Sequence, residues 1–245
     1  MLKLKTNNNK SIGYVEVAKG SLHSEIYKNE HVRVYIATIP PGISTLYHRH
    51  SEDTVYIVLE GGIMSTKNFK GSKRSLMDFP RSFHFYHKIW FLIQNIFTGS
   101  VKLPKKLFFF MRNKKHPAIH KASASYRNTA DMRIMGVEII GGHGHHRPVM
   151  LDHNLYSKGY EADNFSVFSF KMTAGRTSGI HSFAFPFFIL CVNGFADIDV
   201  ENGHTTQLEH HSLKTGNFLS MESLKTINIK NERNEILEMI LIVLQ

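Results

Sequence analysis

The chain has 245 residues, of which 42% are hydrophobic and 11% aromatic, so it is long enough for one large or two modest domains and too apolar to be disordered. A single cysteine, Cys191, excludes an internal disulfide framework and fits a reducing compartment. The first thirty residues hold no apolar stretch typical of an export signal, and no apolar run reaches the roughly 18 residues of a membrane-spanning helix. We therefore expect a cytoplasmic protein.

The formal net charge of +10 would suggest a nucleic-acid partner if it were spread over the whole chain. It is instead concentrated in residues 61–117, which hold 12 of the 30 basic residues and one of the 20 acidic residues. These bases lie within apolar sequence and accompany no recognised nucleic-acid-reading motif. We expect no nucleic-acid partner, and we assign the charge to one local segment.

Most elements predicted along the chain are short strands. The run HVRVYIATIPPG, His31–Gly42, alternates Val32, Val34 and Ile36 with other residues and ends in prolines and a glycine, as a half-buried antiparallel strand does. Similar runs are TVYIVLEGG, MRIMGVEII, NFSVFSFKM, PFFILCVNG, FADIDVENG, KTINIKN and EILEMILIVL. Many short strands separated by turn residues predict an all-β sandwich or barrel.

The segment FPRSFHFYHKIWFLIQNIFTGS, residues 79–100, departs from this pattern and predicts a helix. Apolar residues from Tyr86 to Phe97 recur at helical spacing, Ser82 is placed to cap the start, and Gly99 follows the end. We expect a helix of about four turns. Our preferred placement is on the outside of its own domain, with solvated lysines around it. A lid, a dimer element and peripheral contact with an anionic membrane are the alternatives.

One sequence frame occurs twice in the chain, at a constant offset of 133 residues. Glycine, five residues, histidine, twelve residues and glycine appear first at Gly42, His48 and Gly61 and again at Gly175, His181 and Gly194. Such self-similarity indicates two copies of one supersecondary unit. We therefore predict two domains, residues 1–144 and 145–245, with the boundary in the Gly/His-rich sequence GGHGHHRP.

The first copy, PGISTLYHRHSEDTVYIVLEGG, resembles the first motif of the cupins, in which His-x-His and a carboxylate stand between two glycines. Cupins are small jelly-roll barrels that often hold one divalent metal, and two tandem copies look like a bicupin. The resemblance implies an all-β fold of two tandem cupin-type β-barrel or jelly-roll domains. On this interpretation the basic, partly helical segment is an insertion in the first domain, over about residues 62–116.

The resemblance implies a metal site in the first domain. His48 and His50 would be two ligands, and the period of a strand places both imidazoles on one face. A later cupin motif supplies a third histidine, for which His120 is our choice and His116 the alternative.

The carboxylate is where this chain departs from the cupin motif. The position seven residues before Gly61 is Thr54, and threonine is a poor ligand. Glu52 is the preferred substitute, because it shares the strand parity of the two histidines, and Asp53 is the alternative. Without a carboxylate, three neutral imidazoles would hold the metal, as in the cupin thiol dioxygenases.

The second copy has lost the metal motif. The same alignment places Phe183 at the second histidine position and Phe187 at the carboxylate position. We predict an apolar second pocket, with His181 as a core histidine and a structural or ligand-gripping role for the domain.

The resemblance implies a mononuclear metal-binding bicupin, and its cofactor is one divalent transition metal. The donor types suit iron, zinc, nickel or manganese and do not choose among them. The preferred function is an enzyme acting on a small molecule, with a dioxygenase-type oxidoreductase as the first choice. A non-catalytic protein that binds a small ligand, a membrane or a partner is the alternative. We also expect a homodimer, because cupins commonly pair through their sheets.

Overall fold

The computed structural model describes residues 2–4, 12–70, 77–78, 99–114, 117–141, 155–162, 164–203 and 207–244. The chain divides into two compact units, Met1–Ile140 and Gly141–Gln245. Each unit is built from β-strands, so the all-β prediction is confirmed. The predicted helix over residues 82–98 lies outside the described residues, as does the histidine-rich sequence around residue 144.

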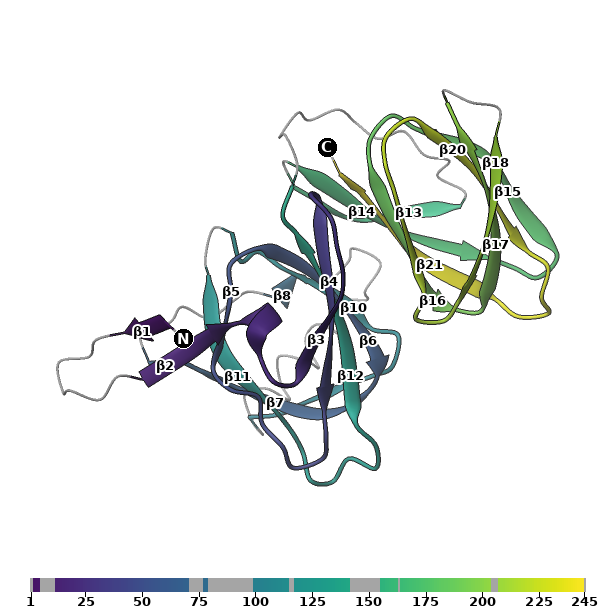
Figure 1. Cartoon of the computed structure of the whole chain (residues 1–245). Helices are drawn as coiled ribbons and strands as arrows, with labels where there is room; N and C mark the ends of the chain where they lie inside the picture. The colour runs from purple at the N-terminus through teal and green to yellow at the C-terminus, as the bar shows by residue number, and fades with distance from the viewer. Residues whose placement is uncertain are drawn as a thin grey trace. The chain divides into compact units, whose positions relative to one another are not determined.

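The first unit consists of two facing six-stranded sheets (Figure 1). One sheet has the order β1-β2-β5-β11-β7-β9 and the other the order β3-β4-β12-β6-β10-β8. The bounds are β1 Leu2–Leu4, β2 Ile12–Glu16, β3 His23–Lys28, β4 Val32–Ile39, β5 His48–His50, β6 Asp53–Glu60, β7 Gly62–Asn68, β8 Met77–Asp78, β9 Val101–Leu103, β10 Phe108–Met111, β11 Ala118–Ala124 and β12 Met132–Ile139. A single 3₁₀ turn, η1 Val17–Lys19, is the only helical element within the described ranges.

The described parts of the expected insertion are strands. β7 pairs with β11 and β9, and β10 pairs with β6 and β8, so these strands belong to the two sheets. The prediction of a partly helical insertion over residues 62–116 is therefore not supported by the part of it that the structure describes. Phe108–Met111 belongs to the barrel because its alternate side chains, Phe109 and Met111, join the core, and β7 contributes Met64.

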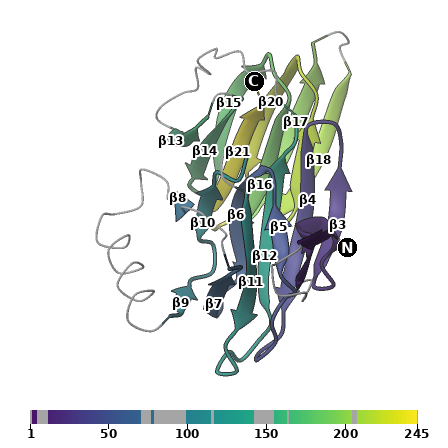
Figure 2. The ribbon, with the colours of Figure 1, turned by 90° about the vertical axis from the view of Figure 1, so that its left-hand side faces the viewer.

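The second unit repeats the architecture with a five-stranded sheet, β13-β14-β21-β16-β19, and a four-stranded sheet, β15-β20-β17-β18 (Figure 2). Its bounds are β13 Tyr156–Glu161, β14 Phe165–Met172, β15 Arg176–Phe183, β16 Phe187–Asn193, β17 Phe195–Asn202, β18 Leu208–Lys214, β19 Phe218–Met221, β20 Lys225–Asn231 and β21 Leu237–Leu244. His210 and His211 lie on β18.

Each unit has its own apolar core between its two sheets. In the first unit the core takes alternate residues of β4, β6, β10 and β12, so that Tyr35, Tyr56 and Ile134 point inward. In the second unit a larger cluster includes Phe183, Phe187 and the free thiol of Cys191. Burial raises the pKa of Cys191 to about 12, as expected for an inert core thiol. No helix in the described ranges has the length and hydrophobicity of a membrane span.

Candidate metal centre

His48 and His50 are brought to one face by the short strand β5. Both side chains are 2% exposed, whereas Arg49 between them points the other way and is half-buried. β11 runs antiparallel to β5, and its register places His120 directly opposite His48. Sequence positions separated by seventy residues therefore meet on one inward-facing surface.

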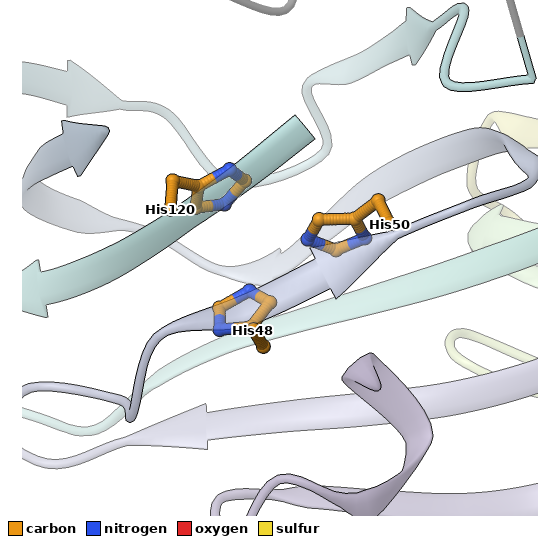
Figure 3. Close-up of side chains that lie close together, drawn as sticks. All are labelled: His48, His50 and His120. Carbon is orange, nitrogen blue, oxygen red and sulfur yellow. The ribbon is translucent and has the colours of Figure 1, made fainter. Parts of the chain in front are cut away.

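The three imidazoles converge (Figure 3). Ring centroids are 4.8 Å apart for His48 and His50, 4.8 Å for His48 and His120, and 4.9 Å for His50 and His120. One nitrogen from each ring lies within 4.8 Å of the other two nitrogens. Three nitrogens at this separation can be brought onto one metal ion by small ring rotations, because metal–imidazole bonds are about 2.0–2.1 Å long.

Two hydrogen bonds direct the ring nitrogens of β5. The Nδ1 of His48 lies 2.9 Å from the carbonyl oxygen of Leu46, which can only accept, so Nδ1 carries the proton. The Nδ1 of His50 lies 2.9 Å from the hydroxyl of Tyr56. The other nitrogen of His50, Nε2, is buried and has no hydrogen-bond partner in the described structure. A buried nitrogen without a partner is where a metal ion fits.

The three histidines are neutral at physiological pH. Burial is the main cause that lowers the pKa of His48, and burial lowers the pKa of His50 well below its usual value. Burial, followed by the charges of His48 and His23, lowers the pKa of His120 to about 3. Only a deprotonated imidazole nitrogen can bind a metal, so no proton has to be removed from an imidazolium before binding.

Glu52 is the predicted carboxylate ligand. It lies in the bend between β5 and β6, where its main-chain oxygen accepts hydrogen bonds from Thr54 and Asn113. Its carboxylate does not belong to the three-histidine group that the described residues form. The alternative Asp53 accepts a hydrogen bond from the backbone of Lys114, and the alternative His116 lies outside the described residues.

A carboxylate does lie inside this barrel, on a strand that the motif does not include. Glu138 of β12 pairs with Thr54 of β6. It lies four residues from Ile134 on the same strand, so its side chain faces the barrel interior as that of Ile134 does. Its side chain is 2% exposed and bonds Arg33 at 3.1 Å. Burial raises the pKa of Glu138 to about 7, while Arg33 lowers the pKa and Glu52 raises it. Glu138 can therefore gain or lose a proton near neutral pH.

The comparisons with known proteins agree with this architecture. The model of the auxin binding protein family matches residues 4–98. AerE from Microcystis aeruginosa is 15% identical and covers 91% of this chain and 97% of its own, with a TM-score of 0.54. A cupin 2 conserved barrel domain protein from Leptotrichia buccalis is 9% identical and covers 96% of this chain and 100% of its own, with a TM-score of 0.52.

The fold is that of two tandem cupin-type barrels. The formate complex of oxalate decarboxylase from Lactobacillus farciminis has a similar fold, with 9% identity, 88% of this chain and 77% of that chain covered, and a TM-score of 0.54. The search of curated proteins finds no match. The comparisons thus establish the fold and leave the chemistry to be argued from the chain's own residues.

Within the described residues, the second unit forms no three-histidine group like that of the first. Phe183 and Phe187 are buried with ring centroids 4.3 Å apart. His181 bonds the carbonyl oxygen of Ser178 at 3.0 Å and packs against Tyr156. Phe183 and Phe187 thus belong to the apolar core of the second unit.

A fourth histidine beside the centre was missed by the sequence analysis. The ring of His23 on β3 lies 4.8 Å from that of His48 and 5.5 Å from that of Tyr35. Its Nδ1 is buried without a hydrogen-bond partner, and burial followed by the charge of His48 lowers its pKa to about 3. The hairpin formed by β3 and β4 could have indicated this position. It pairs His23 with Ala37, which lies two residues from Tyr35 on β4, so His23 faces the barrel interior as Tyr35 does.

Proposed function

We propose that the first unit of this bicupin holds one divalent transition metal through His48, His50 and His120. The observation that carries the proposal is the convergence of three neutral imidazoles, one of which buries a nitrogen without a partner. Iron, zinc, nickel and manganese all accept imidazole ligands, so the donor set does not select the ion. Glu52 remains a predicted fourth ligand. For its carboxylate to reach the metal, the bend after β5 would have to change conformation.

We further propose that the centre makes the protein an enzyme for a small molecule, with a dioxygenase-type reaction as the first choice. A metal held by three neutral nitrogens retains its full charge and keeps open positions for oxygen or substrate oxygens. The chain contributes a water-poor interior, built from Tyr35, Tyr56 and the apolar residues around them. Glu138 supplies a buried carboxyl group that can hold or release a proton near neutral pH.

Metal content tests the first part of the proposal. We expect the purified full-length protein to bind about one equivalent of Zn²⁺ or Fe²⁺, measured by elemental mass spectrometry after dialysis and by calorimetry. His48→Ala and His50→Ala should abolish binding, whereas His181→Ala, in the second unit, should bind as the wild type does. A wild type that takes up no divalent metal would rule out the centre.

Ligand binding to iron tests the second part. The Fe²⁺-loaded protein should bind nitric oxide, a stand-in for dioxygen, and give the electron paramagnetic resonance signal of a high-spin ferrous nitrosyl. A loaded protein that binds no nitric oxide would have no open position, and the dioxygenase assignment would be wrong while the metal centre stood. If nitric oxide binds, oxygen uptake measured with a panel of small organic acids, thiols and diketones would identify the substrate class.

The homodimer and the membrane contact of the basic segment remain separate predictions. Light scattering coupled to size-exclusion chromatography measures the first, and sedimentation with vesicles of anionic lipid measures the second. Neither outcome bears on the metal centre, because its three histidines come from one unit of one chain.

A further inference from the structure

The two histidines of β5 differ in the kind of group that bonds their Nδ1 atoms. His48 faces a carbonyl oxygen, which fixes the proton on Nδ1 and leaves Nε2 with its lone pair. His50 faces the hydroxyl of Tyr56, which can donate or accept. The backbone therefore fixes the tautomer of His48, while the tautomer of His50 depends on one side chain.

Tyr56 lies in a fully enclosed polar pair. It comes from β6, in the sheet opposite β5, so its bond to His50 joins the two sheets of the first unit. The hydroxyl of Tyr35 on β4 donates a hydrogen bond to the oxygen of Tyr56 over 3.2 Å. Tyr35 and Tyr56 are 1% and 7% exposed, so no bulk water substitutes for either partner.

The position of the pair is built into the strands around it. A Cβ at Gly136, on β12 between β4 and β6, would overlap the ring of Tyr35. Phe109 of β10 stacks on the ring of Tyr56 at a centroid separation of 5.0 Å. The ring of Tyr56 is thus packed among neighbouring strands of its own sheet, and this packing holds its hydroxyl against His50.

We propose that Tyr56 is a positioning residue that accepts the Nδ1 proton of His50 and thereby keeps Nε2 of His50 available for a metal ion. The inference rests on the proposed metal centre and adds the residue that sets its affinity. If Nδ1 were the acceptor, the proton would lie on Nε2, where the described structure offers it no partner and where it would block coordination.

Tyr56→Phe removes the acceptor and keeps the ring. The Nδ1 proton of His50 is then buried without a partner, so His50 shifts toward the Nε2-protonated tautomer. We expect the dissociation constant for Zn²⁺ to rise by about 10–100-fold, the usual effect of losing such a partner. Calorimetry on the full-length protein measures this change.

Tyr35→Phe is the matched control. It breaks the same hydrogen bond between the two tyrosines but leaves the contact of Tyr56 with His50, so the affinity for Zn²⁺ should stay close to the wild-type value. Equal losses in both variants would show that the tyrosine pair acts only by packing and would overturn the proposal. The double variant Tyr35→Phe/Tyr56→Phe leaves no tyrosine hydroxyl without its partner. It should lose as much affinity for Zn²⁺ as Tyr56→Phe does, and it replaces that variant if Tyr56→Phe does not fold.

The side-chain ¹⁵N shifts of His50 provide a readout that needs no metal. In the metal-free wild type and in Tyr35→Phe we expect Nδ1 to carry the proton, and in Tyr56→Phe we expect a shift toward Nε2. A wild-type His50 protonated on Nε2, or an unchanged tautomer in Tyr56→Phe, would overturn the inference. Failure of the wild type to bind any metal would refute the proposed function instead, so the two failures are distinguishable.

Discussion

Thr54 is the residue at which this centre departs from the cupin motif. It is fully buried, and its hydroxyl donates to the carbonyl oxygen of Glu52 at 2.8 Å. Its partner on the adjacent strand is Glu138. The carboxylate of Glu138 is therefore one strand away from the position that the motif assigns to it, and it forms an ion pair with Arg33.

Restoring the carboxylate should strengthen metal binding. We expect Thr54→Glu to raise the affinity for Zn²⁺ by about tenfold or more, because a negative charge about 4 Å from a divalent ion contributes at least about 2 kcal/mol. The metal-free variant should be less stable than the wild type, by roughly 1–3 kcal/mol, since the added group is buried. Calorimetry and urea unfolding measure the two effects.

Thr54→Gln is the control for this substitution, because it has nearly the same size and no charge. Its affinity for Zn²⁺ should not rise. If Thr54→Glu and Thr54→Gln bound the metal equally well, position 54 would not face the ion, and the carboxylate position implied by the cupin motif would not apply to this chain.

Glu138 should make the stability of the protein depend on pH. Burial raises its pKa from 4.5 to about 7, so between these values the folded state holds a proton that the unfolded state has released. The free energy of unfolding therefore falls as the pH rises through this window, by up to about 1.4 kcal/mol per pH unit. Glu138→Gln removes this contribution, so the difference between the two proteins in urea unfolding should slope between pH 4.5 and 7. Parallel curves would show that Glu138 ionises normally.

At the scale of strands, the sequence predicted the local geometry of the centre and missed its long-range pairings. The period of two places His48 and His50 on one face, and any extended strand would do the same. The partner of His48 depends on the register between β5 and β11, which no local pattern encodes. His120 was identified from the cupin resemblance, and only the register explains why it fits.

The alternation of side chains along β6 and β12, in the sheet opposite β5, could have identified the polar residues that face the barrel interior. Tyr56 and Thr54 alternate along TVYIVL, and Glu138 shares the parity of Ile134 along MRIMGVEI. Both runs were predicted as strands, and none of their polar residues was assigned to the inward face. The lesson is physical: a polar side chain at an inward position must find a partner, and here the partners are His50 and Arg33.

Gly136 shows how tightly the strands of this sheet are packed. Its missing side chain leaves room for the ring of Tyr35, and an added methyl group would overlap that ring. We expect Gly136→Ala to lower the free energy of unfolding by about 1–3 kcal/mol, the usual penalty for overpacking. Urea unfolding measures the loss.

A smaller residue at position 35 should relieve this overlap. Combining Gly136→Ala with Tyr35→Leu should therefore destabilise the protein by less than the sum of the two single changes. Simple additivity would place the ring of Tyr35 away from Gly136 and contradict the packing described for the tyrosine pair.

The two units of the whole molecule show how one frame can keep or lose a site. Both carry the glycine and histidine frame at the same spacing, and both form two-sheet barrels with separate cores. In the first unit the inward positions hold three imidazoles, and in the second they hold Phe183 and Phe187. At these positions the second barrel packs aromatic rings, whereas the first leaves Nε2 of His50 buried without a hydrogen-bond partner.

This division predicts that metal binding stabilises only one half of the chain. A ligand at a hundred times its dissociation constant stabilises the folded state by about 2.7 kcal/mol, and the effect is confined to the part that unfolds when the site is lost. In hydrogen exchange followed by mass spectrometry, added Zn²⁺ should slow exchange in β5 and β11 and leave β15 and β16 of the second unit unchanged. His50→Ala should remove the protection without altering exchange in the second unit. Equal protection of both units would mean that they unfold together, and the metal would then be acting on the whole chain.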